Sequence, residues 1–478
     1  MKSLFVKGLV IRLRAYKEIP IEQDPAFALA DMVVNTKYED LTADQVEKAK
    51  KSILDTVAVI IGGSEQNCVP PVVDFIKRYK GFGEGRVLVY GYQVPAPLAG
   101  YANGTMARAL DLGDCHNTGG HISEFNVPTM ISAIGLADKP VTGKAFITAY
   151  AVGAEWGTRH HTAMRLQYHT TGLPGEAGWT WAGPSLAKML GLNKDQVLNM
   201  MGICYTSHGL PEQQKYVEGR ESVRLQHGIF ADNVIKSAMM AKAGVTGPLA
   251  IYLGKVGFLR FVIWDDVEPE VLTEDLGKRW LWSEELALKP YASCKFTHTL
   301  VSGMNRLRDQ HHIDWRDIMD IHCMVSAGAQ ICIQPVRWKP ETKGDAMFSI
   351  PYCIAHAAMK GDVFLDAFND QELADPEKLE LMQKIRADVC TDESFPIFDG
   401  FPLEVTLKDG SKYSIADEEV PGNPKNPMSW KQLEDKFWKC VPYAAVELPE
   451  QNLRKAIELC KSLENIQDMN ELVDKLIP

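Results

Sequence analysis

The chain has 478 residues, of which 46% are hydrophobic and 24% are charged, so it has a globular composition and exceeds the usual size of one hydrophobic core. Its formal net charge is −11. This acidic balance argues against nucleic acid or an anionic membrane as the main partner, because both require a basic surface. Length and composition therefore favour a two-domain protein.

The cysteines and the N-terminal segment bear on the compartment. The ten cysteines are scattered without a C-x-x-C pair, which favours reduced thiols in a cytoplasmic protein. No apolar run reaches the length that spans a membrane. The N-terminal segment is basic and lacks acids before Glu18, but Lys7 interrupts its apolar stretch and no cleavage-like site follows. We expect a surface arm or an edge segment.

From about Pro25 to about Gly257 the apolar residues recur at helical spacing. Segments with this spacing are 41–63, 71–80, 103–112, 129–137, 142–161, 181–192, 193–209 and 227–244. Thr42 and Asn193 stand where helix N-caps belong, and Gly244 stands where a helix ends. The sequence therefore predicts an all-α domain.

The segment 103–121 is the most informative part of the chain. A small-residue helical stretch is followed by a Gly-rich turn with two carboxylates, a thiol and two imidazoles, which are Asp111, Asp114, Cys115, His116 and His121. A loop between two helices can turn several such groups toward one cavity, as proton transfer requires. The alternative is an Asx-type turn in which Asp111 or Asp114 caps the next helix and the histidines are solvated.

Beyond about Leu286 the pattern becomes mixed. Short strands are predicted in 318–329, 386–394 and 403–415, with a Lys-Asp-Gly hairpin turn in the last, and helices in 296–310 and 348–361. After a Pro/Gly-rich linker the chain is helical again from Met428. We therefore predict a helical domain over 1–284, an α+β lid domain over 285–422 and C-terminal helices over 423–478 that return to the helical domain.

Three weaker motifs carry little functional information. The glycines of 81–91 neither follow a strand nor open a helix, so we interpret the segment as an ordinary loop rather than a phosphate-binding loop. His160 and His161 are adjacent and face apart on a helix, which disfavours joint metal binding. The tryptophan pair in 178–185 is typical of core or interface packing. We expect no bound metal.

Three further segments combine ionisable groups with loops or helix starts. These groups are His169 in YHTTG, Arg224 in VRLQHG, and Lys289, Cys294, Lys295 and His298 in KPYASCKFTH. Each alone is also consistent with a buried polar group that is satisfied by its neighbours. Together they indicate a polycarboxylate site spread over two domains.

The same segments resemble the MmgE/PrpD family, which includes 2-methylcitrate dehydratase, cis-aconitate decarboxylase and iminodisuccinate epimerase. The matching segments, in order, are SILDTVAVIIGG, ANGTMARALDLGD with His121 and Pro128, YHTTG, VRLQHG, KPYASCKFTH, FSIPYCIAHAAMKG, VTLKDG and PGNPKNPMSWKQLEDKF. The resemblance implies a helical domain with a smaller α+β lid domain, a homodimer, and cofactor-free chemistry on a small carboxylate in the cleft between the domains.

The resemblance also implies the site residues. By motif position they are the catalytic residues Asp111, His121, His169 and Tyr352, and the substrate-binding residues Cys115, Arg224 and Lys289. The chain departs from the family at three of its positions: Cys115 replaces the threonine of the decarboxylases, Val223 a usual lysine and Gln226 a common histidine. Loss of the lysine removes a cation from the pocket, so we expect a smaller or less charged acid than the familiar tricarboxylates.

The predicted function is a cofactor-independent lyase, first of all a dehydratase, that acts on a small di- or tricarboxylate. Arg224 and Lys289 stabilise negative charge, and His121 or His169 serves as base and acid. Asp111 orients a histidine and Tyr352 donates a proton. An epimerase or isomerase, a decarboxylase of a related dicarboxylate, and a non-catalytic binding protein are the alternatives.

Overall fold

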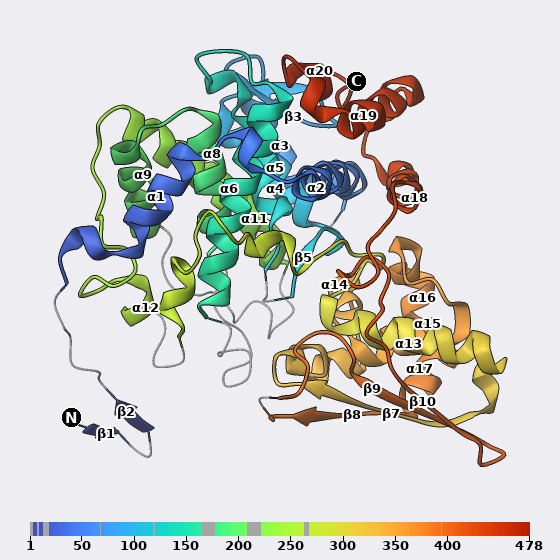
Figure 1. The fold of residues 1–478 in the computed structure, drawn as a ribbon. Coiled ribbons are helices and arrows are strands. Elements are labelled where there is room, and N and C mark those ends of the chain that lie inside the picture. The colour runs from blue at the N-terminus through green and yellow to red at the C-terminus, as the bar shows by residue number, and fades with distance from the viewer. Residues whose placement is uncertain are drawn as a thin grey trace.

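The computed structural model describes residues 3–6, 9–12, 19–66, 68–117, 120–164, 177–207, 221–261, 267–392 and 394–478. These residues form a large helical domain and a smaller α+β domain (Figure 1). The fold is thus mainly α with a second α+β domain, as the sequence predicts. None of the described helices is long and apolar enough to cross a membrane.

The helical domain is built from the first part of the chain. Its described helices are α1 (Pro25–Asn35), α2 (Ala43–Gly63), α3 (Val69–Ile76), α4 (Ala96–Arg108), α5 (Ser123–Ser132), α6 (Gly143–Thr162), α8 (Trp179–Met189), α9 (Lys194–Ser207), α11 (Ser222–Lys242) and α12 (Phe258–Phe261). The predicted start of α2 is confirmed, because Thr42 and Gln45 form a capping box. After α11 the chain turns at Gly244, whose φ is 93°.

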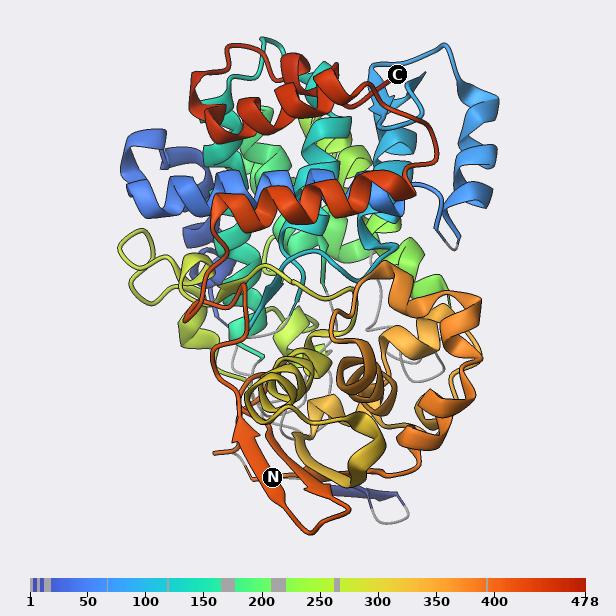
Figure 2. The same cartoon turned by 90° about the vertical axis from the view of Figure 1, so that its right-hand side faces the viewer.

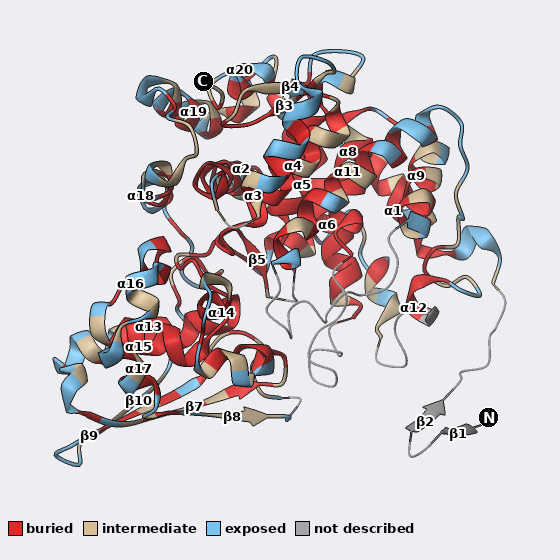
Figure 3. Cartoon of the chain, turned by 180° about the vertical axis from the view of Figure 1, so that it is seen from behind, coloured by how far each residue is buried: buried red, intermediate tan, exposed pale blue. Residues whose placement is uncertain are grey.

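The core of this domain lies around α4, α5 and α6, which are buried along most of their length (Figure 3). The sequence explains this position, because the helices carry few charged residues and many small ones. Small residues allow helix backbones to approach closely. A Cβ on Gly104 of α4, for example, would lie 2.7 Å from the carbonyl oxygen of His227 in α11.

Three short two-stranded ladders accompany the helices. They are β1 (Ser3–Val6) with β2 (Leu9–Arg12), β3 (Gly85–Val87) with β4 (Tyr92–Val94), and β5 (Cys115–His116) with β6 (Leu286–Ala287). The β3–β4 pair corrects the prediction of an ordinary loop over 81–91, because Gly85 and Val87 pair with Val94 and Tyr92. The β5–β6 pair connects segments about 170 residues apart, a contact that local sequence patterns do not encode.

The α+β domain contains one four-stranded sheet and several helices. Its strands are β7 (Ile318–Ser326), β8 (Ile385–Cys390), β9 (Pro402–Leu407) and β10 (Lys412–Ala416), in the order β10-β9-β7-β8, and only β7 and β8 among these neighbours are parallel. Its helices are α13 (Lys295–His311), α14 (Lys343–Met347), α15 (Ile350–Lys360), α16 (Asp370–Leu373) and α17 (Pro376–Met382). The predicted Lys-Asp-Gly turn joins β9 to β10, with Gly410 at a φ of 88°.

The C-terminal helices lie on the helical domain. They are α18 (Trp430–Cys440), α19 (Glu450–Lys461) and α20 (Asn470–Val473). Figure 2 shows α18 beside α2, and the two helices are in contact. Gly62 of α2 permits this approach, because a Cβ there would lie 3.1 Å from the Cβ of Cys440. A buried ion pair between Lys436 and Asp55, with Nζ and Oδ1 2.6 Å apart, also joins the helices.

Candidate active site

The loop 109–122 joins α4 to α5 and carries most of the predicted site residues; we call it the α4–α5 loop. The chain turns sharply at Asp111, whose φ of 50° is left-handed, a conformation that Asp tolerates better than most residues. Because Gly104 brings α4 close to α11, the loop lies near Arg224 in the first turn of α11. The local chain geometry thus brings residues from two helices and a loop together.

Buried side chains hold the backbone of this loop from Asp111 to Asp114. The contacts are Lys289 Nζ to the Asp111 carbonyl (3.1 Å), Lys436 Nζ to the Leu112 carbonyl (2.8 Å), the Gly113 N–H to Glu124 Oε1 (3.0 Å) and His121 Nδ1 to the Asp114 carbonyl (2.9 Å). Such contacts satisfy backbone groups that would otherwise be costly to bury. Two of them come from segments beyond residue 285, so distant parts of the chain set the shape of the loop.

Asp111 lies next to three buried cations, Arg108, Arg224 and Lys289, which we call the cationic cluster. Arg108 pairs with Asp111 Oδ1, and Lys289 Nζ lies 3.4 Å from Oδ2. Burial by itself raises the pKa of Asp111, but Lys289 and Arg108 outweigh it and hold this pKa well below its ordinary value of 3.8. Asp111 is therefore ionised, and it pairs with Arg108 and Lys289.

Arg224 differs from Arg108 and Lys289 in its contacts with the described residues. Its side chain is buried, with 3% of the residue exposed. Nη1 donates to the carbonyl of Arg108 (3.3 Å) and Nη2 contacts Met347 Sδ (3.3 Å), and no carboxylate of the described residues pairs with it. Met347 belongs to α14, so Arg224 reaches from the helical domain to the α+β domain. A buried guanidinium of this kind is suited to a carboxylate supplied by a ligand.

His121 borders the cluster as a neutral imidazole. Burial, then Arg108 and Lys289, lower its pKa well below the ordinary value of 6.5. Its Nδ1 donates to the carbonyl of Asp114, because a carbonyl oxygen can only accept. This bond leaves the lone pair on Nε2, so the ring is prepared to accept a proton there. The group that orients His121 is thus the Asp114 carbonyl and not Asp111, which pairs with cations.

The other predicted site residues are Cys115, Tyr352 and His169. Cys115 is buried on β5, beside Lys289 and Lys295, and burial raises the pKa of its thiol to about 12. Tyr352 is not brought to the cluster: its hydroxyl donates to the Ala367 carbonyl (2.7 Å) inside the α+β domain. His169 lies outside the described residues.

The structure adds three residues that the sequence analysis did not assign to the site. Arg108 pairs with Asp111, Lys436 holds the loop, and Glu124 lies between two histidine rings. Arg108 lies within the segment 103–121 that the motifs mark and Glu124 lies three residues after it, so their position in sequence was a usable signal. Lys436 lies in the matching segment PGNPKNPMSWKQLEDKF, but the segment alone did not place it at the site, because only tertiary packing brings α18 to the loop.

The Lys436 contact leads to a prediction about stability. Lys436→Met should lower the free energy of unfolding by roughly 3–5 kcal/mol, because it leaves Asp55 as a buried charge without its partner. Urea unfolding followed by tryptophan fluorescence measures this change. The double variant Asp55→Leu/Lys436→Met should recover part of the loss, because it removes both charges. A single variant as stable as the wild type would rule out a structural role for the pair.

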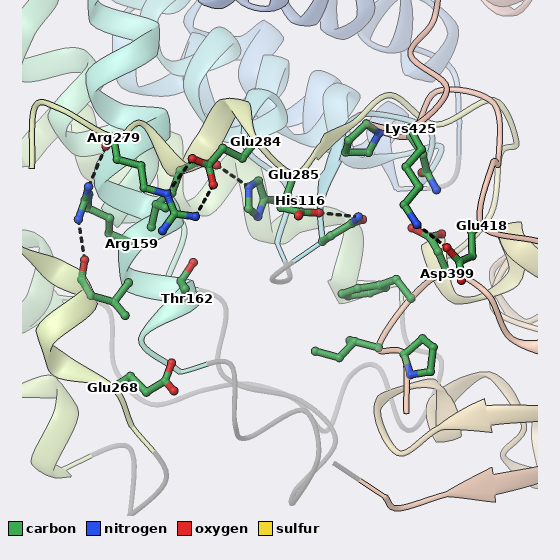
Figure 4. A pocket seen from close by; sticks show the side chains of 18 of the residues that line it. His116, Arg159, Thr162, Glu268, Arg279, Glu284, Glu285, Asp399, Glu418 and Lys425 are labelled. Atoms are coloured by element: carbon green, nitrogen blue, oxygen red, sulfur yellow. Dashed lines mark hydrogen bonds and ion pairs between the residues drawn. The ribbon is translucent and has the colours of Figure 1, made fainter. Parts of the chain in front are cut away.

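A cleft of about 680 Å³ opens between the two domains, on the other side of β5 (Figure 4). Cys115 faces the cationic cluster, whereas His116, the next residue of the strand, lines the cleft, as expected for alternating strand side chains. None of the predicted site residues that the structure describes lines this cleft. The candidate active site is therefore the buried cluster, and the cleft is a separate feature beside it.

The cleft carries more negative than positive side chains. Its charged lining residues are Arg159, Glu268, Glu274, Asp275, Arg279, Glu284, Glu285, Asp399, Glu418 and Lys425. Arg279 and Glu284 pair across 2.6 Å, and Arg159 Nη1 donates to the carbonyls of Val271 and Glu274 at 2.7 Å.

Within the described residues, no three His, Cys, Asp or Glu side chains form a group that could hold a metal ion.

The fold and the site define a class: a two-domain, mainly α protein with a buried cationic cluster and a histidine where the domains meet. The chain belongs to the MmgE/PrpD family. Residues 28–270 match the model of the MmgE/PrpD N-terminal domain, and residues 291–462 match that of the MmgE/PrpD C-terminal domain. The resemblance predicted from the sequence motifs is confirmed.

Curated relatives match over nearly the whole chain. The chain is 25% identical to the cis-aconitate decarboxylase-like protein oryM of Aspergillus oryzae, covering 93% of this chain and 95% of the relative. It is 23% identical to cis-aconitate decarboxylase of Homo sapiens, with 94% of each chain covered. It is 24% identical to cis-aconitate decarboxylase of Aspergillus terreus, with 92% and 94% covered.

Proposed function

We propose that this chain is a cofactor-independent lyase that acts on a small di- or tricarboxylate at the cationic cluster. The observation that carries the proposal is the buried Arg224, which pairs with no carboxylate of the described residues and lies beside Lys289 and Asp111. Burying such a charge is costly unless a partner arrives, and a substrate carboxylate is the partner that fits a guanidinium. Decarboxylation is the reaction that the relatives favour.

The chemistry follows from the charge distribution. When CO₂ leaves, the electron pair of the broken C–C bond stays on the adjacent carbon, which then accepts a proton. Arg224 and Lys289 stabilise the negative charge that develops there. His121 first takes up a proton from water at Nε2, whose lone pair is left available by the bond from Nδ1 to Asp114, and then donates that proton to the carbon. The hydroxide left behind combines with the released CO₂ as bicarbonate. In a dehydration the same Nε2 removes a proton from carbon before hydroxide leaves, and in an epimerisation it removes a proton without a leaving group.

Two other predicted catalytic residues, His169 and Tyr352, have different roles in this mechanism. We propose His169 as a second acid or base. Tyr352 is left out of the proton transfer, because its hydroxyl donates to Ala367 and accepts from the buried Lys378 at 3.2 Å. A homodimer and a cytoplasmic location remain proposals that rest on the family resemblance and on the scattered cysteines.

The substitution at Val223 leads to a prediction about the substrate. Val223 is buried near the cluster and supplies no charge where the family usually has lysine. A charged hydrogen bond contributes about 1.5–3 kcal/mol, so we expect cis-aconitate to be turned over roughly 10- to 100-fold less efficiently than a smaller or less charged acid.

A panel of di- and tricarboxylates followed by proton NMR checks this prediction and identifies the reaction. The spectra distinguish loss of CO₂, loss of water and exchange of a carbon-bound proton. Efficient decarboxylation of cis-aconitate would show that the substitution is harmless. Binding of carboxylates without turnover of any of them would favour the non-catalytic alternative.

A further inference from the structure

Glu124 occupies an unusual position at the start of α5. Its side chain is fully buried, and its Oε1 accepts the Gly113 N–H at 3.0 Å. Its Oε2 lies 3.6 Å from Nδ1 of His121 and 3.5 Å from Nδ1 of His227. One carboxyl group thus connects the α4–α5 loop with two imidazole rings.

The surroundings are built to hold Glu124 in this place. Gly113 permits the contact, because a Cβ on that residue would lie 2.2 Å from Glu124 Oε1. Phe125 packs on the ring of His227 with centroids 3.7 Å apart and stacks on Trp181 at 5.5 Å, so one side of the pair is closed by apolar rings. The carboxyl group therefore has few alternatives to its contacts with the loop and the histidines.

We propose that Glu124 is a positioning residue of the proposed active site, which as an uncharged carboxylic acid joins the α4–α5 loop to His121 and His227 without adding negative charge to the cationic cluster. This inference rests on the proposed function, because the cluster is taken to bind a substrate carboxylate. An ionised Glu124 would compete with that carboxylate for the same cations.

The protonation of the carboxyl group is consistent with its hydrogen-bonding geometry. Oε1 accepts a backbone N–H, so the acid hydrogen belongs on Oε2. Nδ1 of His121 already donates to Asp114, so it cannot accept this hydrogen. Nδ1 of His227 lies 3.5 Å from Oε2, which is a close contact rather than a formed hydrogen bond. Burial raises the pKa of Glu124 to about 8, although Arg108 and Lys289 lower it, so the acid is mostly uncharged at neutral pH.

Charged and titratable groups face Glu124 from several elements. They are Arg108 of α4, Asp111, Asp114 and His121 of the α4–α5 loop, Arg224 and His227 of α11, and Lys289 after β6. From α2 and α6, Asp55 and Tyr150 face Asp114. Burial raises the pKa of Asp114 to about 7, so this carboxyl titrates beside Glu124 and serves as an internal reference.

The test uses the full chain labelled with ¹³C at histidine Cε1, with the resonances assigned from His121→Ala and His227→Ala. In the wild type we expect both resonances to shift near pH 8, where Glu124 ionises. Glu124→Gln keeps the acceptor for the Gly113 N–H and should abolish this shift near pH 8. The smaller shift of the same histidine resonances near pH 7, where Asp114 ionises, should persist. As a matched control, Asp24→Asn removes another buried carboxylate, which caps α1, and should leave the shift in place.

The second readout is the pH dependence of kcat/KM on the best substrate of the carboxylate panel. Wild-type kcat/KM should fall about fivefold between pH 8 and 9 through a rise in KM, because the ionised Glu124 opposes an anionic substrate. Glu124→Gln should retain its efficiency at pH 9, and kcat should change little. A purely structural role would not move this alkaline limb.

The outcomes separate the two proposals. A chain that turns over no carboxylate but shows the Glu124-dependent NMR shift would overturn the proposed function and leave the position of Glu124 standing. Absence of the shift in the wild type, or its persistence in Glu124→Gln, would overturn the role of Glu124. If Glu124→Gln fails to fold, Gly113→Ala, whose methyl group displaces the carboxyl, should weaken the shift in the same way.

Discussion

Replacing His121 by alanine should lower kcat by roughly two to four orders of magnitude, because a positioned acid or base contributes that much to catalysis. Substrate affinity should change far less, since the cations that bind carboxylate are unaffected. Steady-state kinetics on the best substrate of the panel measures both quantities. In a dehydration or an epimerisation, where the neutral ring is the base that removes the proton, the wild-type acidic limb of kcat/KM should also lie below pH 6.5, because burial and the neighbouring cations lower the pKa of His121.

A matched control is His322→Ala. His322 lies on β7 and pairs with Asp388 at the surface, far in sequence from the cluster, so its removal should alter stability by no more than about 0.5 kcal/mol and leave kcat intact. A folded His121→Ala protein with near-normal turnover would move the proton transfer to His169.

Replacing Arg224 by methionine should raise KM by roughly 10- to 100-fold, the range expected for loss of a charged hydrogen bond of about 1.5–3 kcal/mol. The midpoint of thermal unfolding should stay the same or rise, because the variant removes a buried charge that no described carboxylate compensates. Kinetics and calorimetry of the same preparation measure the two effects.

Arg224→Lys is the conservative comparison. It keeps the charge but loses the planar fork, so KM should lie between those of the wild type and of Arg224→Met. A marked loss of stability in Arg224→Met with KM unchanged would show that Arg224 is structural and that the carboxylate binds elsewhere.

Much of the fold follows from local sequence. Helical spacing and capping residues such as Thr42 locate α2 and its neighbours, and the Lys-Asp-Gly turn locates β9 and β10. The amphipathic helices after Met428 pack on α2, as expected for apolar stripes that need a partner. The β5–β6 ladder was not predictable, because two-residue strands carry too little pattern and their pairing depends on the tertiary structure.

The site was predictable in part. Motif positions pointed to Asp111, Arg224 and Lys289, which the structure brings together from a loop, a helix and the start of the α+β domain. The sequence analysis predicts that Asp111 orients a histidine. In the structure Asp111 instead pairs with Arg108, a contact that the motif did not specify. Tyr352 was placed by motif alone, and a motif does not specify where the hydroxyl points.

The central claim is that the buried cluster around Asp111 and His121 is the active site. Turnover of the best substrate in D₂O, followed by proton NMR on the wild type, His121→Ala and His322→Ala, tests it most directly. We expect the wild type and His322→Ala to incorporate solvent deuterium at the reacting carbon at equal rates, and His121→Ala to do so at least about 100-fold more slowly. Equal deuterium incorporation by all three proteins would contradict the claim.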